Sequence, residues 1–214
     1  QEVNDGFTRY LYPDGKVSSE GTLRNGKPDG YWKTFYTNGA LKSEGNRKDF
    51  KLDSIWTFYT DSGKVKSVLQ YQLGKKEGVQ IYYNDLGLKL SEENFHNDQH
   101  QGVTRYFDEQ GNLQKIIPFD AGVEEGIGRE YASDGRIIAV IEYKKGYVVK
   151  EEKINRKDRA GLNQGLWKEF YADEIKVKSE GIYKDNKKQQ NWTQYDEFGR
   201  ITKEELYING ELVQ

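Results

Sequence analysis

Residues 30–39, "GYWKTFYTNG", hold four aromatic residues in ten positions and end in a turn signal. Residues 165–174, "GLWKEFYADE", repeat most of the first seven letters of that stretch. An aromatic phrase that recurs in a polar chain indicates a repeat architecture, in which each unit buries its apolar side chains only against its neighbours. The organisation of the chain follows from locating the other copies.

Two series of glycines define the repeat. The residue just after each turn signal recurs every 24 residues, at Gly15, Gly39, Gly63, Gly87, Gly111 and Gly135. The residue that opens each repeat follows the same period, at Gly6, Gly30, Ser54, Gly78, Gly102 and Gly126. A fixed period of this kind is the signature of tandem structural units.

The repeats divide the chain into three predicted parts. A six-unit hairpin repeat array is predicted at 6–149. Residues 150–164, "KEEKINRKDRAGLNQ", do not match the repeat and are predicted to form an irregular joint. The phrase restarts at Gly165 and again near Asn191, so two further repeat units are predicted at 165–214.

Each repeat is predicted to be a β-hairpin. In the first repeat, Pro13 fixes its φ near −65° and so excludes a type I′ turn. Pro13-Asp14-Gly15 instead fits a type I turn followed by a glycine in the left-handed conformation, which forms a bulge. This turn predicts that Leu11 lies opposite Val17, and in the second repeat that Phe35 lies opposite Leu41.

Alternation along the strands assigns residues to two faces. Positions two, six and twelve of each repeat are mostly apolar and are predicted to share the first face, with the frequent serine of position fourteen between them. By the same register, Glu44 is predicted opposite Trp32 on the second face. This second face carries an aromatic series at Tyr10, Trp32, Trp56, Phe58, Tyr82 and Tyr106, with Trp167 and Trp192 later in the chain.

The pattern predicts an all-β fold: an elongated, twisted antiparallel meander of tandem 24-residue β-hairpins. Composition agrees, because aromatic residues make up 14% of a chain whose mean hydropathy is −0.97, and disordered chains are poor in aromatics. A sheet of this length is expected to twist and coil, so that part of its aromatic face is covered.

The phrases "GYWKTFYTNGALKSEG", "GLWKEFYADEIKVKSEGIYKDNK" and "YFDEQGNL" resemble MORN repeats. They resemble more closely the bacterial variant of YwqK-type proteins, which are described as antitoxin components of toxin–antitoxin modules. The resemblance implies a β-hairpin array that binds a protein partner. Asp173-Glu174 departs from the usual Asn-Gly turn, and repeats three to six lack Glu-Gly after the turn, so the middle of the array is expected to be less regular.

The sequence predicts no catalytic, cofactor-binding or metal site. Residues 21–27, "GTLRNGK", have the spacing of a phosphate-binding loop, but Pro28 stands where that loop needs Ser or Thr for magnesium. His96 and His100 fall in a turn and are expected to be solvated. There is no cysteine, which excludes thiol chemistry. Carboxylates recur at one repeat position, which indicates a structural role, at Glu20, Glu44, Glu92 and Glu180.

The second-face aromatics have two interpretations. They are core residues if the sheet covers them, or a partner surface if it does not. The candidate partner surface consists of Tyr10, Trp32, Trp56, Phe58, Tyr82 and Tyr106. We expect a non-enzymatic scaffold for an unidentified protein partner, which the resemblance implies is a toxin. The alternative is an exported or surface-attached glycan-binding module, because aromatic rows also suit sugars.

Charge and hydropathy narrow the choice of partner. The formal net charge is −2, without the basic excess of nucleic-acid-binding proteins. No apolar run approaches the ~18 residues that a membrane helix needs. Residue 1 is Gln and the chain has no Met. A removed signal peptide is one origin of such an N-terminus, so we expect export to the periplasm, outer membrane or extracellular space, with a trimmed cytoplasmic chain as the alternative.

Overall fold

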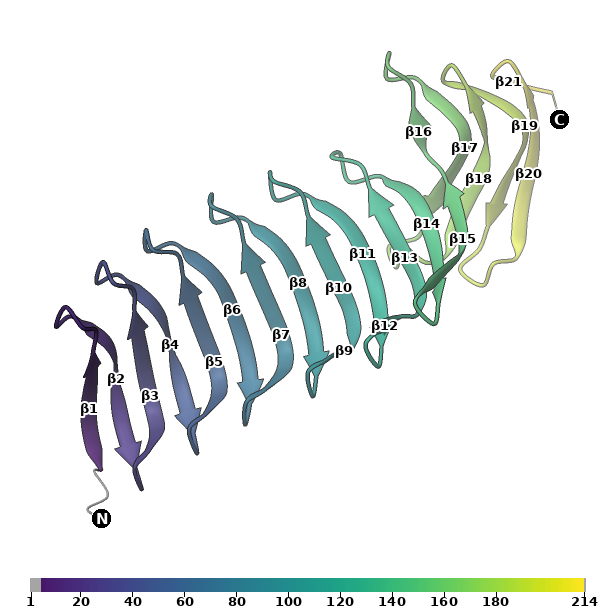
Figure 1. Ribbon diagram of the computed structural model, residues 1–214. Coiled ribbons are helices and arrows are strands. Elements are labelled where there is room, and N and C mark those ends of the chain that lie inside the picture. The colour runs from purple at the N-terminus through teal and green to yellow at the C-terminus, as the bar shows by residue number, and fades with distance from the viewer. Residues whose placement is uncertain (1–4, 214) are drawn as a thin grey trace. The chain divides into compact units, whose positions relative to one another are not determined.

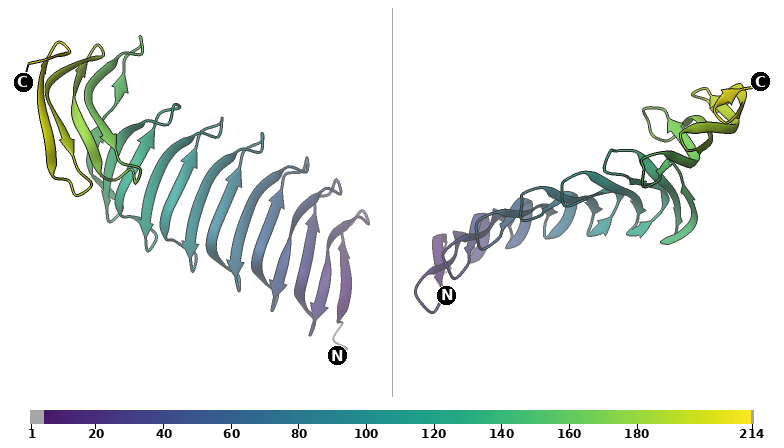
Figure 2. Two further views of the ribbon diagram at one scale, coloured as in Figure 1. Left: turned by 180° about the vertical axis from the view of Figure 1, so that it is seen from behind. Right: turned by 90° about the horizontal axis from the view of Figure 1, so that it is seen from above.

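A computed structural model describes residues 5–213 of the 214-residue chain, and these residues form strands and turns without any helix. The chain divides into an N-terminal unit, residues 1–126, and a C-terminal unit, residues 127–214. Both are built from antiparallel hairpins that follow one another along the chain (Figures 1 and 2). The predicted all-β hairpin meander is therefore confirmed.

In the N-terminal unit, consecutive strands pair side by side in a single layer, with the two-residue strands β9 and β12 paired to the ends of β8 and β11 (Figure 1). The strands are β1 Gly6–Leu11, β2 Val17–Arg24, β3 Lys27–Phe35, β4 Leu41–Lys48, β5 Lys51–Tyr59, β6 Val65–Gln72, β7 Lys75–Tyr83, β8 Lys89–His96, β9 Gln99–His100, β10 Gly102–Phe107, β11 Leu113–Asp120 and β12 Val123–Glu124.

In the C-terminal unit, β13 to β15 pair in sequence order, and β16 to β21 form a second run of sequential pairs. The strands are β13 Gly126–Tyr131, which starts at the unit boundary, β14 Ile137–Lys144, β15 Tyr147–Lys153, β16 Arg156–Lys157, β17 Asn163–Phe170, β18 Val177–Lys184, β19 Lys187–Tyr195, β20 Ile201–Ile208 and β21 Glu211–Leu212.

The hairpin turns have the predicted geometry. Gly39 adopts a φ of 89°, and its amide donates to the Tyr36 carbonyl at 2.8 Å. Leu11 pairs with Val17 and Phe35 pairs with Leu41, as the turn requires. The left-handed glycine is needed because a side chain at this φ meets its own backbone.

The bulge after each turn reverses the assignment of side chains to faces. Phe35 pairs with Leu41, but its neighbour Thr34 pairs with Ser43, so one extra residue is inserted in β4. Leu41 and Ser43 therefore lie on opposite faces although they are two positions apart. The prediction that position fourteen shares the first face is wrong.

The same bulge moves the recurrent carboxylate. Glu44 pairs with Lys33, whereas Trp32 pairs with Gly45. The predicted position of Glu44 opposite Trp32 is thus wrong by one residue, and Glu44 lies on the first face. A one-residue change in register always transfers a side chain to the other face of a sheet.

Side chains tie each turn to the next one along the array. The Tyr12 hydroxyl donates to the Phe35 carbonyl at 2.6 Å, and the Tyr36 hydroxyl donates to the Tyr59 carbonyl at 2.7 Å. The C-terminal unit repeats this bond from Tyr171. Every such bond joins neighbouring repeats only, which is the pattern expected of a quasi-one-dimensional array.

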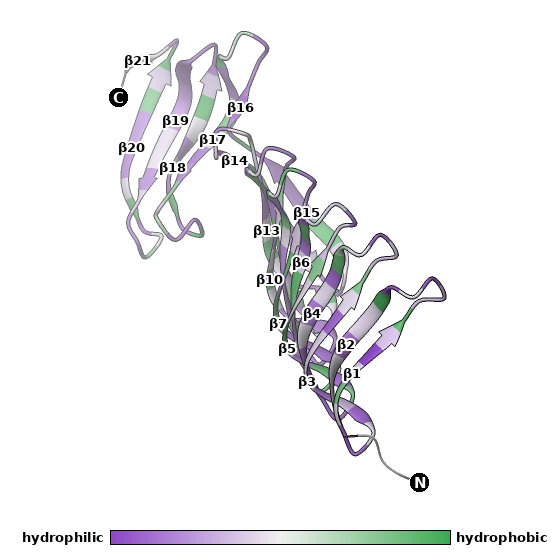
Figure 3. Ribbon diagram, turned by 90° about the vertical axis from the view of Figure 1, so that its left-hand side faces the viewer, coloured by the Kyte–Doolittle hydropathy of each residue, from purple (hydrophilic) through white to green (hydrophobic). Residues whose placement is uncertain are grey.

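Apolar and polar bands alternate along the strands (Figure 3). In the N-terminal unit the buried cluster lies on the second face and is formed by Leu23, Trp32 and Trp56. In the C-terminal unit, β14 buries every second residue. The buried apolar residues of this unit are Tyr131, Ile137, Ala139, Ile141, Tyr143, Ile154 and Trp192.

Residues 150–164 lie inside the C-terminal unit and contain the end of β15, the short strand β16, a turn and the start of β17. Ile154 and Asn155 are both buried there. The Asn155 amide group donates to the carbonyls of Ile137 at 3.0 Å and Lys168 at 2.9 Å, and Asn155 Oδ1 accepts from the Lys168 amide at 2.7 Å. One side chain therefore connects β14 to β17.

Gly39→Val is expected to lower the free energy of unfolding by roughly 1–3 kcal/mol, because a β-branched residue is strained at positive φ. Lys42→Ala, an exposed site three residues on, is expected to cost under about 0.5 kcal/mol. Urea unfolding of the two variants measures the difference. Equal losses would contradict the left-handed turn.

Candidate binding surface

The structure separates the six residues of the predicted partner surface. Trp32 is 4% exposed and Trp56 is 1% exposed, so both belong to the core rather than to an accessible surface. Phe58 packs against them. Tyr10 is 49% exposed and stacks on Trp32 with ring centroids 6.3 Å apart, while Tyr82 and Tyr106 are half-buried.

Glycines on the neighbouring strand create the space for the tryptophan rings. A Cβ placed on Gly45 would lie 2.6 Å from the Trp56 ring, and Gly21 and Gly181 stand in the same relation to Trp32 and Trp192. The Trp56 indole nitrogen donates to the Asn46 carbonyl at 2.6 Å. The ring therefore lies flat across the adjacent backbone, and this fit requires glycine.

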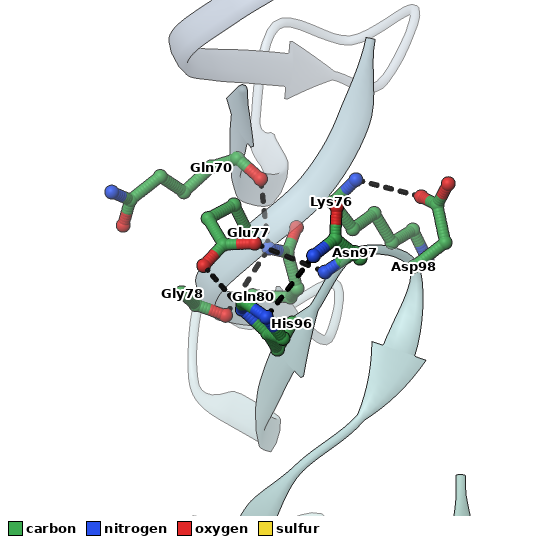
Figure 4. Close-up of polar contacts among 8 residues, drawn as sticks. All are labelled: Gln70, Lys76, Glu77, Gly78, Gln80, His96, Asn97 and Asp98. Atoms are coloured by element: carbon green, nitrogen blue, oxygen red, sulfur yellow. Dashed lines mark hydrogen bonds and ion pairs between the residues drawn. The ribbon is translucent and has the colours of Figure 1, made fainter. Parts of the chain in front are cut away.

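The next repeat replaces both partners of this contact. Leu69 occupies the position of the glycine, and Gln80, which pairs with it, occupies the position of the tryptophan. The fully buried Gln80 amide donates to the Gln70 carbonyl at 2.9 Å, as the indole does to Asn46 (Figure 4). A larger residue on one strand is thus matched by a smaller one on the next.

The two histidines differ in environment. His96 is exposed, with Nδ1 2.9 Å from Glu77 Oε1 (Figure 4), and it fits the expected solvated side chain. His100 does not. Its side chain is 23% exposed, lies 3.1 Å from Glu93, and meets the rings of Phe95 and Phe119 edge-on. The expectation of a solvated His100 is therefore wrong.

The first face of the N-terminal unit carries a regular series of accessible apolar side chains. Position two of the repeat projects one such residue from each of β1, β3, β5 and β7. We call these residues the apolar row: Phe7, 66% exposed, Tyr31, 51%, Ile55, 59%, and Val79, 39%. On the intervening strands, they pair with Thr22, Asn46, Gln70 and Asn94.

This composition distinguishes the row from a solvated polar face. Neighbouring members are two strands apart, about 10 Å, and polar side chains occupy the strands between them. Apolar anchors mixed with hydrogen-bonding groups are typical of protein interfaces. The row is thus a surface on which an extended partner segment can find both kinds of contact.

A tyrosine–carboxylate pair occupies the same face, next to the row. The Tyr59 hydroxyl donates to Glu44 Oε1 at 2.7 Å, and Lys33 lies 4.0 Å from the other oxygen. The bond to Glu44 raises the pKa of Tyr59 to about 12, and the bond from Tyr59 holds the pKa of Glu44 below its usual value. Tyr195 and Glu180 make the same bond in the C-terminal unit.

The stability contributed by this pair should depend on pH. Tyr59 ionises near pH 10 when unfolded and at about 12 when folded, so its contribution is complete below pH 10 and lost as pH rises through 12. The contribution of Glu44 is lost as pH falls through its lowered pKa. The stability difference between wild type and Tyr59→Phe should therefore be largest near neutral pH. A difference that stays constant in urea melts from acid to alkaline pH would contradict this role.

Residues 5–213 contain no group of three or more His, Asp or Glu side chains placed to hold a metal ion. Over the same range, no helix is long and apolar enough to cross a membrane. The recurrent carboxylates on the first face are joined to tyrosine, arginine or lysine. Glu20, for example, accepts from Arg9 at 2.8 Å. These carboxylates recur at the same position of each repeat that contains them, and each is paired within the sheet.

The apolar row was visible in the sequence as the apolar residue at position two, but alternation alone did not show which face of the sheet is covered. The signal that identifies the other face as the core is the triplet Ser-Glu-Gly at residues 19–21, 43–45 and 179–181. Its glycine is the one residue type that admits a flat tryptophan ring from the next strand.

Three segments of the chain match the sequence model described as the MORN repeat variant, at residues 28–49, 52–73 and 101–121. Each matched segment contains one hairpin: β3–β4, β5–β6 and β10–β11. MORN repeats are commonly protein-interaction or binding repeats.

Comparison with curated proteins gave no significant match. The solved structure titled "Crystal Structure of TcdB2-TccC3-TEV" aligns with 95% of this chain at 13% identity and a TM-score of 0.29. The aligned region covers 12% of that chain, so this chain spans a small part of its length.

Proposed function

We propose that this protein is a non-enzymatic repeat scaffold that binds a protein partner through the apolar row. The supporting observation is the exposure of one large apolar side chain on each of four alternate strands of one face, while the opposite face holds the core. Exposed apolar patches of this kind mark interaction sites, because they add nothing to the stability of the free protein.

The partner we propose is a toxin, by analogy with the YwqK-type antitoxins that the sequence resembles. The array suits such a role because binding requires a stable, extended surface and no chemistry. The glycan alternative relied on accessible tryptophans, and burial of Trp32 and Trp56 removes that support. We therefore propose a protein ligand rather than a sugar.

The proposal is tested with a partner co-purified from the native source and identified by mass spectrometry. Titration calorimetry then compares wild type with Tyr31→Ser/Ile55→Ser, which removes the centre of the row. We expect at least a tenfold loss of affinity, since central interface anchors typically contribute over ~1.4 kcal/mol. Thermal melts should change little, because both side chains are exposed.

The matched control is Lys42→Ser/Lys66→Ser, two exposed substitutions on the neighbouring strands β4 and β6. This variant should bind as wild type does. Unchanged affinity of the row variant would contradict the proposed surface. For a toxin partner, inhibition of toxicity by wild type but not by the row variant would support the antitoxin role.

A further inference from the structure

The residue just before the turn glycine departs from the repeat at two places. It is polar in five hairpins, at Asp14, Asn38, Ser62, Gln110 and Asp134. It is small at Ala160, before Gly161, and in two further hairpins it is large and apolar. Leu86 in the N-terminal unit is 77% exposed, and Phe198 in the C-terminal unit is 82% exposed. A single exposed apolar residue is ordinary on a protein surface, so these two tips are of interest only for what lies beside them.

Each apolar tip stands beside a hollow. Leu86 borders one of about 630 Å³, whose floor is formed by Val65, Val68 and the Tyr83 ring. Phe198 borders one of about 540 Å³, formed by repeat-equivalent residues that include Val177 and Tyr195. The two hollows thus arise at the same position of the repeat, one in each unit.

Both hollows also carry charges of both signs. Lys64 and Asp85 line the first, and Lys176 and Glu197 are their equivalents in the second. The second hollow is less apolar, because Glu180 replaces Val68 and lies 3.1 Å from Lys168, which also lines the hollow. An occupant that complements both hollows is therefore apolar at its centre and charged on either side.

The tips are held rigidly by the same local bonds. Asn84 Oδ1 accepts from the amides of Leu86 at 3.0 Å and Leu88 at 2.9 Å. Asp196 Oδ1 accepts from the amides of Phe198 and Arg200, each at 2.9 Å. A side chain fixed in this way loses little conformational entropy when it meets a ligand, which favours binding.

The hairpin β10–β11, which follows the hairpin of Leu86, shows that the repeat does not by itself produce such a site. Its tip is Gln110, although Asp108 holds that turn by the same bonds. The strand before this hairpin is β8, and at the positions equivalent to Val65 and Val68 it carries Lys89 and Glu92. These two residues form a salt bridge of 2.8 Å. Both positions are charged there, whereas the second hollow keeps the apolar Val177 at the position of Val65.

We propose that each hollow receives one large apolar side chain from an extended segment of the protein partner, flanked in that segment by an acidic and a basic residue. This inference rests on the proposed function, because the first hollow continues the apolar row. Tyr83 follows Val79 by four residues on β7 and so lies on the same face. The first hollow is much smaller than a stable interface of about 20–30 residues a side, so it anchors a segment that the row also holds.

The test uses two acetylated tripeptide amides, Asp-Phe-Lys and Asp-Ser-Lys, titrated into the ¹⁵N-labelled full chain. We expect the Phe peptide to shift the amides of residues 83–87 and 195–199 saturably, with a roughly millimolar Kd for a single anchor. The Ser peptide should give shifts at least about fivefold smaller. Equal shifts from the two peptides, or no saturable shift at either hollow, would overturn the inference.

Leu86→Asp should abolish the shifts at residues 83–87 and leave those at 195–199. Gln110→Asp, at the equivalent turn, is the matched control and should leave both sets. Shifts at 83–87 that persist in Leu86→Asp would also refute the assignment.

Titration of the natural partner separates this inference from the proposed function. If Tyr31→Ser/Ile55→Ser weakens the complex at least tenfold and Leu86→Asp/Phe198→Asp does not, the hollows are refuted while the row stands. If Leu86→Asp/Phe198→Asp weakens the complex and Tyr31→Ser/Ile55→Ser does not, the hollows are supported and the proposed row is refuted. Losses with both variants support both.

Discussion

Replacing Trp56 by alanine is expected to lower the free energy of unfolding of the N-terminal unit by about 3–5 kcal/mol. Trp56 is the largest fully buried side chain among residues 5–213. Its removal leaves a cavity above Gly45 and deprives the Asn46 carbonyl of its donor. Urea unfolding followed by circular dichroism measures the loss. A change below about 1 kcal/mol would show that the ring is a surface group after all.

A double substitution tests the cause of that effect. Gly45→Leu alone should also be strongly destabilising, because even its Cβ would lie 2.6 Å from the ring. Gly45→Leu combined with Trp56→Gln reproduces the natural Leu69–Gln80 pair. The double variant should therefore be more stable than the sum of the single effects predicts, by about 2 kcal/mol. Additive losses would mean that glycine and tryptophan are not matched.

Asn155→Ala is expected to destabilise the C-terminal unit by about 3 kcal/mol, because one buried and two part-buried hydrogen bonds are lost and the backbone groups of Ile137 and Lys168 lose their partner. Asn155 also adopts a φ of 53°, which asparagine tolerates better than alanine. Thermal and urea melts of the whole chain measure the effect.

Asn155→Gly is the control for the backbone contribution, since glycine adopts positive φ freely but makes no side-chain bonds. If the hydrogen bonds dominate, the glycine variant should lose nearly as much stability as the alanine variant. Near wild-type stability of Asn155→Gly would instead assign the effect to backbone strain.

The sequence was sufficient for the hairpins because their turns are local. The glycine period, the Pro-Asp-Gly turn and the pairing of Leu11 with Val17 all depend on residues within one repeat. The face assigned to position fourteen was wrong, because the bulge after the turn inserts an extra residue in the second strand of the hairpin. Simple alternation places Ser43 with Leu41, whereas the bulge places it with Thr34.

The sequence left the position of the core open for a different reason. Both faces of the predicted sheet were rich in aromatic residues, and alternation does not show which face is covered. Side-chain volume would have decided the question, because glycine at 21, 45 and 181 leaves room for a tryptophan ring from the adjacent strand. Only the polar neighbours of the row, such as Asn46 and Gln70, indicated that it stays accessible.

His100 and the apolar tips needed three-dimensional information. His100 meets Phe119 from a different hairpin, so its loop position in the sequence did not show its burial. Leu86 and Phe198 appear unremarkable as single residues. They stand out only when aligned with the polar tips of the other repeats and placed beside the hollows of their own units.

Hydroxyl-radical footprinting of the chain with and without its purified protein partner tests the central claim most directly. In the free protein Tyr31 and Ile55 should be modified readily, and Trp32 and Trp56 should not, because the first pair is exposed and the second buried. Binding through the apolar row predicts at least a severalfold protection of Tyr31 and Ile55 in the complex, with Lys66 on β6 unchanged. Equal modification of Tyr31 and Ile55 in the free and bound protein would contradict it.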